Sequence, residues 1–193
     1  MARMGAELRR QDFVEATVKV IAEHGVANAT TRRIAAAAGC PLASLHYVFH
    51  TKDDLFYAVY ESLFNLPHQA LEEVPAGTTA AETTAGVLRQ LIAWIIRHPD
   101  AARAQNELFF WAMRNDPEMA NKIYSVALEA TEQALERATG LHRENAVLKA
   151  ASRLLIQLVD GLIIAWSAHG DLARLQAETE TACKALALLV AND

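Results

Sequence analysis

Side chains that can hydrogen-bond to base edges and phosphates are concentrated between residues 30 and 52 of the 193-residue chain. In this stretch Ser44, His46 and Tyr47 can donate or accept hydrogen bonds, and Leu42 and Ala43 can contact thymine methyl groups. Hydroxyl and basic side chains flank them on both sides, where phosphate contacts would fix the position of a bound duplex. The residues that we predict to contact DNA are Thr30, Thr31, Arg32, Arg33, Pro41, Leu42, Ala43, Ser44, His46, Tyr47, His50, Thr51 and Lys52.

A helix-turn-helix between Thr30 and Leu55 would position these side chains. Thr30 and Thr31 are both suitable N-caps for a first helix that continues to Ala38. Gly39 can adopt the positive φ that a tight turn requires. The spacing therefore predicts one short helix, a glycine turn and a second short helix.

The second helix is expected over about Leu42–Phe49, with Pro41 at its first position, where a missing N–H costs nothing. Leu45 and Phe49 stand four residues apart, so both would face the same small core. The remaining face, with the base-reading side chains, would then point outward into a major groove.

Basic charge is concentrated at this end of the chain. Residues 1–52 hold seven lysines and arginines against four acidic residues, whereas residues 53–193 hold eleven against nineteen. The net charge of −5 taken alone argues against a nucleic-acid partner, but this distribution predicts that only the first part approaches a polyanion. We expect a DNA-binding domain over 1–52 and a second domain over 53–193.

The composition predicts an all-α fold. Hydrophobic residues make up 52% of the chain, with only 8 glycines and 5 prolines and no β-branched runs. Apolar residues recur at three- and four-residue steps, and a loose connection is expected over 67–78. About nine helices are expected, over approximately 9–24, 30–38, 42–49, 52–66, 79–98, 100–114, 118–139, 143–168 and 172–190.

The segment TTRRIAAAAGCPLASLHYVFHTKDDLFYAV, residues 30–59, resembles the DNA-binding segment of the TetR family of bacterial transcriptional regulators. The segment departs from the family pattern in two ways: His46 replaces the usual tyrosine of the second helix, and Cys40-Pro41 replaces a Val-Ser pair whose serine caps that helix. The matching residues are Thr31, Ile34, Ala35, Ala38, Gly39, Tyr47, Phe49, Thr51, Lys52 and Leu55.

The resemblance implies an N-terminal three-helix domain and a C-terminal helical bundle for ligand binding and dimerisation. It further implies a homodimer built from the last two long helices, a palindromic DNA operator, and release by a small-molecule effector. The sequence supports the dimer independently, because residues 143–168 and 172–190 are apolar over more than one face. Cys183 is expected to pack in that interface.

Aromatic, methionine and polar side chains of the middle helices suit a pocket for a small apolar or aromatic molecule. An ordinary role in the core stays open for each aromatic residue. The predicted ligand-binding residues are Trp94, Gln105, Phe109, Phe110, Met113, Tyr124 and Trp166.

The sequence gives little support for metal binding, redox chemistry or catalysis. His46 and His50 have the i, i+4 spacing of a zinc pair, but no third ligand lies near them, so no metal or other cofactor is expected. Cys40 stands at the expected start of a helix, where a thiolate is favoured, so a redox role stays open. A role as a small buried residue is nevertheless the favoured interpretation. No nucleophile elbow, phosphate loop or zinc-protease motif is present, which argues against an enzyme.

Two widely separated cysteines make no disulfide pattern, and the most apolar segment is interrupted by Gln157 and Asp160. We therefore expect a cytoplasmic protein with no membrane partner.

The sequence thus predicts a ligand-responsive, DNA-binding transcriptional regulator, a repressor that binds a palindromic operator as a homodimer. The alternative is a helical small-molecule-binding or protein-interaction module that does not bind DNA. Salt-dependent affinity for DNA separates the two.

Overall fold

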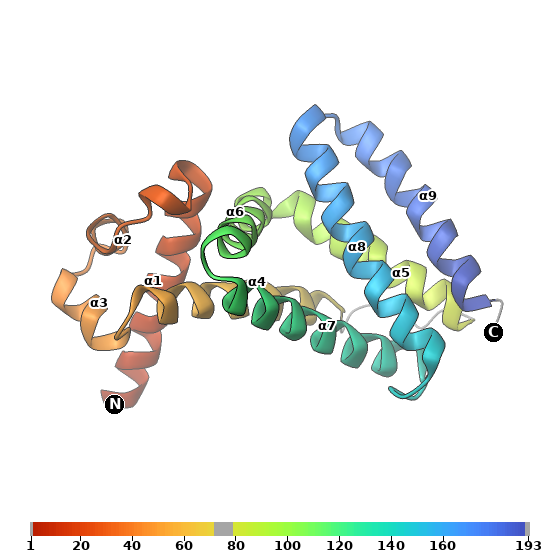
Figure 1. The fold of residues 1–193 in the computed structure, drawn as a ribbon, viewed down its shortest axis with the longest axis horizontal. Coiled ribbons are helices and arrows are strands. Elements are labelled where there is room, and N and C mark those ends of the chain that lie inside the picture. Colours follow the sequence, from red (N-terminus) through yellow and green to blue (C-terminus); the bar gives the residue numbers. More distant parts are fainter. Residues whose placement is uncertain (1, 72–78, 192–193) are drawn as a thin grey trace. The chain divides into compact units, whose positions relative to one another are not determined.

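The computed structural model describes the backbone of residues 2–71 and 79–191 and the side chains of residues 7–63 and 79–191. These residues form nine α-helices and one 3₁₀ helix, η1, with no strand among them, so the predicted all-α fold is confirmed. In chain order the elements are α1 Ala2–His24, η1 Val26–Asn28, α2 Thr31–Ala37, α3 Leu42–Val48, α4 Lys52–Leu71, α5 Ala80–Arg97, α6 Pro99–Asn115, α7 Pro117–Thr139, α8 Ala146–His169 and α9 Leu172–Ala191 (Figure 1).

Helix ends differ from the sequence-based prediction at several places, among them the start of α8, which is Ala146 rather than residue 143. Helix α1 begins at Ala2 rather than near Arg9. Pro41 is the N-cap of α3 with an extended ψ of 142°, and is not its first helical residue. Helix α4 continues past Pro67 to Leu71, because a proline removes one intrahelical hydrogen bond without preventing helical dihedrals in the residues after it. Of the predicted connection, residues 72–78 lie outside the described residues.

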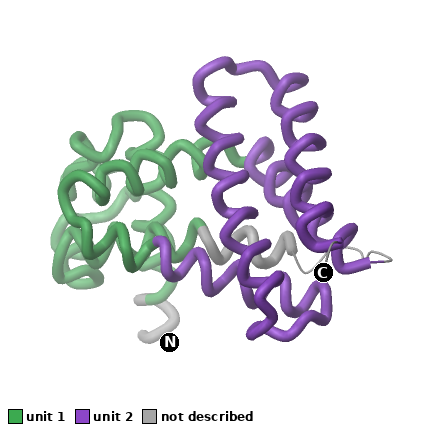
Figure 2. Tube along the Cα trace, turned by 45° about the vertical axis from the view of Figure 1, so that its right-hand side comes forward, with its two compact units in different colours: residues 1–63, 98–123 green, residues 64–97, 124–193 purple. Residues whose placement is uncertain are grey.

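The chain divides into two compact units (Figure 2). Unit 1 comprises residues 1–63 and 98–123, and unit 2 comprises residues 64–97 and 124–193. The boundaries fall within α4 and α7, and α6 belongs to the unit that contains the helix-turn-helix. Compactness does not test the functional boundary at residue 52, which stays a prediction.

Large apolar side chains from five helices form the core of unit 1. Phe13, Ile34, Leu45, Phe56 and Leu108 come from α1, α2, α3, α4 and α6, and each is fully buried. Helix α1 packs against α2, α3 and α6. The two short helices α2 and α3 thus rest on a longer helix, which supplies the apolar surface that they are too short to provide for each other.

Unit 2 is built on α5, α8 and α9, which pack against one another. Arg89 of α5 donates two hydrogen bonds, of 2.7 and 2.9 Å, to the Glu180 carboxylate of α9. The Cys183 thiol is buried between the same helices, with its Sγ 3.4 Å from the Ala85 carbonyl oxygen. The expectation that Cys183 packs in a subunit interface is therefore wrong, because its side chain is already buried within one chain.

Candidate functional site

The turn between α2 and α3 has the geometry that the sequence predicts. Gly39 adopts a φ of +63°, and the Cys40 N–H donates to the Ala35 carbonyl oxygen at 3.0 Å. Pro41 has no side-chain group with which to cap α3, and the Ser44 N–H instead donates to the Pro41 carbonyl oxygen at 2.9 Å. The turn therefore ends α2 and starts α3 through backbone hydrogen bonds alone.

Helix α3 has one buried and one exposed face. Leu45 and Phe49 are almost completely buried, which holds the helix on the core of unit 1. Tyr47 is 79% exposed, a value so high that its ring makes little contact with the rest of the chain. Of the other predicted contact residues on this segment, Pro41, Ala43, His46 and His50 are exposed, and Leu42 and Ser44 are partly buried. Most of the face predicted to read base edges is thus exposed to solvent.

Thr30 caps the start of α2, the segment that flanks α3 on one side. Its hydroxyl oxygen accepts a hydrogen bond from the Arg33 N–H at 3.3 Å, so Thr30 rather than Thr31 is the N-cap. The Arg33 guanidinium donates to the Asn28 carbonyl oxygen at 3.0 Å, which orients an exposed side chain beside the turn. Arg32 is exposed as well, and Thr31 is partly buried.

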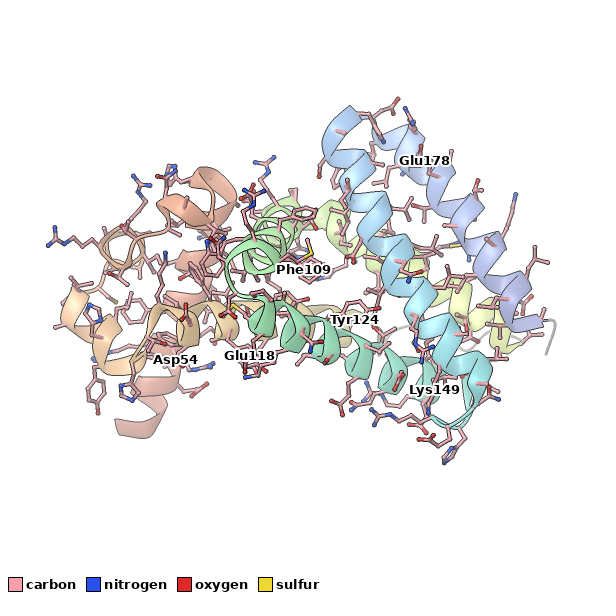
Figure 3. The ribbon with its side chains drawn as sticks, viewed as in Figure 1. Asp54, Phe109, Glu118, Tyr124, Lys149 and Glu178 are labelled. Carbon is pink, nitrogen blue, oxygen red and sulfur yellow. The ribbon has the colours of Figure 1, made fainter. Side chains whose placement is uncertain are left out.

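The opposite flank is the first turn of α4. Thr51 and Asp54 form a reciprocal capping box, in which each backbone N–H donates to the other side chain at 3.0 Å. The Lys52 ammonium lies 4.7 Å from the centre of the Phe56 ring. Burial lowers the pKa of Lys52 from its usual value, and the Asp53 carboxylate partly offsets that shift. Figure 3 shows Asp54 on this first turn of α4.

Two aromatic contacts hold α4 in unit 1, and sequence reasoning missed both. The rings of Phe56 and Trp111 of α6 meet edge to face with centroids 5.5 Å apart. The Lys122 ammonium of α7 lies 3.7 Å from the centre of the Tyr57 ring. The helical pattern of α4 indicates that Phe56 faces inward, but the identity of its partner depends on a contact between residues far apart in sequence.

The predicted ligand-binding residues are distributed over both units. Trp94, Tyr124 and Trp166 belong to unit 2, where Trp94 is buried and the other two are partly buried. Gln105, Phe109, Phe110 and Met113 lie together on α6 in unit 1 (Figure 3 labels Phe109).

Two of the α6 side chains are unusually exposed for apolar residues. Phe110 is 46% and Met113 47% exposed, so neither is an ordinary core residue. The rings of Phe109 and Phe110 have centroids 6.5 Å apart and are tilted by 49°. Phe110 and Met113 thus give α6 an exposed apolar surface.

The described part of the chain has no helix long and apolar enough to cross a membrane. The same residues contain no group of three or more His, Cys, Asp or Glu side chains placed to hold a metal ion.

A glycine turn between two short helices, an exposed polar face on the second and basic side chains on both flanks define a helix-turn-helix DNA-binding protein. Comparison with known proteins agrees with this class. Residues 13–59 match the family model described as "Bacterial regulatory proteins, tetR family". This segment of the chain, residues 13–59, is therefore a DNA-binding segment of the TetR type. The chain is accordingly a DNA-binding transcriptional regulator.

Relatives match over most of the chain. The HTH-type nicotine-responsive transcriptional repressor HdnoR of Paenarthrobacter nicotinovorans is 27% identical over 159 residues, which cover 79% of this chain and 80% of HdnoR. The HTH-type transcriptional regulator BetI of Brucella suis is 28% identical over 182 residues, covering 89% of this chain and 86% of BetI.

Solved structures share the fold. The multidrug binding protein EbrR, complexed with imidazole, superposes with a TM-score of 0.72 at 22% identity, covering 94% of this chain and 89% of EbrR. A transcriptional regulator from Rhodococcus sp. Rha1 has the same TM-score at 21% identity and covers 94% of this chain and 95% of its own.

Proposed function

We propose that this regulator is a homodimeric repressor that binds a palindromic operator and is released by a small aromatic effector. The observation that supports operator reading most directly is the exposed face of α3, above all Tyr47, held between the flanks of α2 and α4. In this arrangement α3 enters the major groove, Arg32 and Arg33 contact phosphates on one side, and Lys52 contacts them on the other.

Dimerisation is supported by apolar side chains that one chain leaves uncovered. Ile164 of α8 and Leu172 and Leu188 of α9 are each more than two-fifths exposed, on two helices that pack against each other. An isologous pairing of the α8–α9 surface would cover these side chains with the same surface of a second copy. Such a dimer would place two α3 helices in successive major grooves, about 34–36 Å apart.

An aromatic effector is supported by the uncovered apolar side chains of α6. Phe110 and Met113 offer a ring and a polarizable thioether, which favour flat apolar ligands. Among similar proteins, HdnoR is described as nicotine-responsive, and EbrR structures contain ethidium or malachite green. All three compounds have aromatic rings. Repression is supported by the description of HdnoR as a repressor.

The decisive experiment selects bound sequences from a random DNA pool with the full chain and then measures affinity for the selected duplex at several salt concentrations. We expect a palindromic site and a steep loss of affinity as salt rises. Arg33→Ala and Lys52→Ala should weaken binding, whereas Arg153→Ala, which removes an exposed charge from α8, should not. Affinity that is independent of salt and of all three substitutions would instead favour a helical binding module that does not act on DNA.

The effector is tested by thermal unfolding in the presence of a panel of small aromatic compounds. A true effector should raise the melting temperature of the free protein and release it from the selected duplex. Phe110→Ala should reduce both effects, while Arg103→Ala, at an exposed position of the same helix, should leave ligand stabilisation unchanged. If the effector raised the melting temperature of Phe110→Ala as much as that of the wild type, a binding site on α6 would be contradicted.

A further inference from the structure

Helix α1 extends beyond the part of it that the core uses. Phe13 is the first buried residue on the helix, and among the described side chains before it only Arg10 is even partly buried. Arg9 and Arg10 stand four and three residues before Phe13, so both continue the side of α1 that faces α2 and α3. Figure 1 shows this end of α1 extending past α3.

The Arg10 side chain lies against the C-terminal end of α3. Its guanidinium carbon lies 5.5 Å from the centre of the Phe49 ring, and Phe49 is the C-cap of α3. The next residues along the chain are His50, Thr51 and Lys52, which form the flank at the start of α4. A guanidinium held over an aromatic face loses little further side-chain freedom when it binds a phosphate.

Lys52 makes a similar cation–aromatic contact at the start of α4. That ammonium covers the Phe56 ring and is partly buried, whereas Arg10 covers Phe49 from a different helix. Two cations stacked on two aromatic rings therefore border the exposed His50. Of the two acidic residues that follow Lys52, Asp54 is engaged in the capping box with Thr51.

The donors of Arg10 remain available. Glu7 stands three residues before Arg10, a helical spacing that permits an ion pair, yet no ion pair or hydrogen bond of Arg10 is found among the described residues. By contrast Arg89, Arg143 and Arg174 of unit 2 are paired with glutamates. A planar fork of free N–H donors on a basic surface matches the oxygens of a phosphate.

We propose that Arg10 is a phosphate-binding residue of the DNA interface and extends it from the helix-turn-helix onto the first turns of α1. Arg10 would contact the backbone of the duplex on the side of the α3 C-terminus, next to the phosphates bound through Lys52. The contact is to phosphate rather than to a base, so it adds affinity for any sequence. This inference rests on the proposed operator-binding function.

The test compares Arg10→Ala, Arg10→Lys and the control Lys19→Ala, which removes an exposed charge from the same helix. Affinity of the full chain for its selected duplex is measured between 50 and 300 mM salt. A dimer loses two contacts in Arg10→Ala, so the slope of log affinity against log salt should become shallower by about 1.8. Arg10→Lys should keep the wild-type slope with weaker binding, and Lys19→Ala should match the wild type.

A second arm replaces single phosphates of the duplex by neutral methylphosphonates. At one phosphate in each half-site, neutralisation should weaken the wild type but not Arg10→Ala, because the two changes remove the same contact. An unchanged slope in Arg10→Ala, or equal losses for both proteins at every phosphate, would overturn the proposal while leaving operator binding intact. A wild-type protein with no salt-dependent DNA affinity would instead refute the proposed function itself.

Discussion

Replacing Asp160 by asparagine should stabilise the protein at neutral pH and leave its stability unchanged in acid. Asp160 lies on α8 between Ile156 and Ile163, which are buried, and no hydrogen bond or ion pair of its carboxyl group is found in the described part of the chain. Burial raises its pKa from 3.8 to about 6. The folded chain therefore holds a proton that the unfolded chain releases between these two values.

The sign and size of the effect follow from proton linkage. The contribution of the Asp160 carboxyl group to the free energy of unfolding is fully present below pH 3.8. It is lost as the pH rises to about 6, because the folded state then contains an unpaired, partly buried charge. A shift of about two pKa units corresponds to at most about 3 kcal/mol, and the residual exposure of Asp160 reduces this to about 1–3 kcal/mol. Asparagine keeps the shape of the side chain and never ionises.

The assay is urea unfolding of wild type and Asp160→Asn from pH 4 to 7.5 at one protomer concentration. The difference between the two proteins isolates Asp160 from the ion-paired Glu144 and Glu180, whose pKa values are lowered and whose contributions fall in acid. The variant should gain about 1–3 kcal/mol between pH 4 and 7, or about 2–10 °C in melting temperature. A difference that is flat across this range would refute the reasoning.

Three further substitutions test the scaffold. Thr51→Ala removes the hydroxyl that accepts the Asp54 N–H and should cost about 1 kcal/mol in urea unfolding, with Thr51→Ser close to wild type; equal losses would contradict a capping role. Trp111→Leu removes the edge-to-face contact with Phe56 and should cost about 0.5–1.5 kcal/mol beyond lost area, which a double-mutant cycle with Phe56→Leu measures as coupling. Additive losses would show that the rings do not interact. Leu188→Glu should shift the protein to monomers in sedimentation, whereas an intact dimer would place the interface elsewhere.

The helix-turn-helix was predictable because its determinants are local. Gly39 adopts the positive φ expected of it, Leu45 and Phe49 are buried as their spacing requires, and Thr30 caps α2. Each signal depends on residues within one turn of each other. The same holds for the all-α class, which the composition and the helical periodicity already indicate.

Contacts between distant residues were not predictable in this way. Periodicity placed Trp111 on a helix of the second domain, yet it packs on Phe56 in the unit of the helix-turn-helix. Cys183 looked like interface packing because α9 is apolar on more than one face, but α5 covers it. The start of α1 was missed because Arg9 and Arg10 interrupt an apolar pattern on the side that the core uses further along.

The placement of α6 in unit 1 has a consequence for how an effector would act. Four of the residues proposed to bind it, from Gln105 to Met113, share a compact unit with α3. Helix α6 packs along α1, and a Cβ added at Gly25, just after α1, would lie 3.6 Å from a Glu107 oxygen. Its Trp111 ring contacts α4, whose first turn is the flank with Lys52. A ligand that displaces α6 would therefore act on α1, which holds α2 and α3, and on α4, which carries Lys52, since packed helices transmit shifts rather than absorb them.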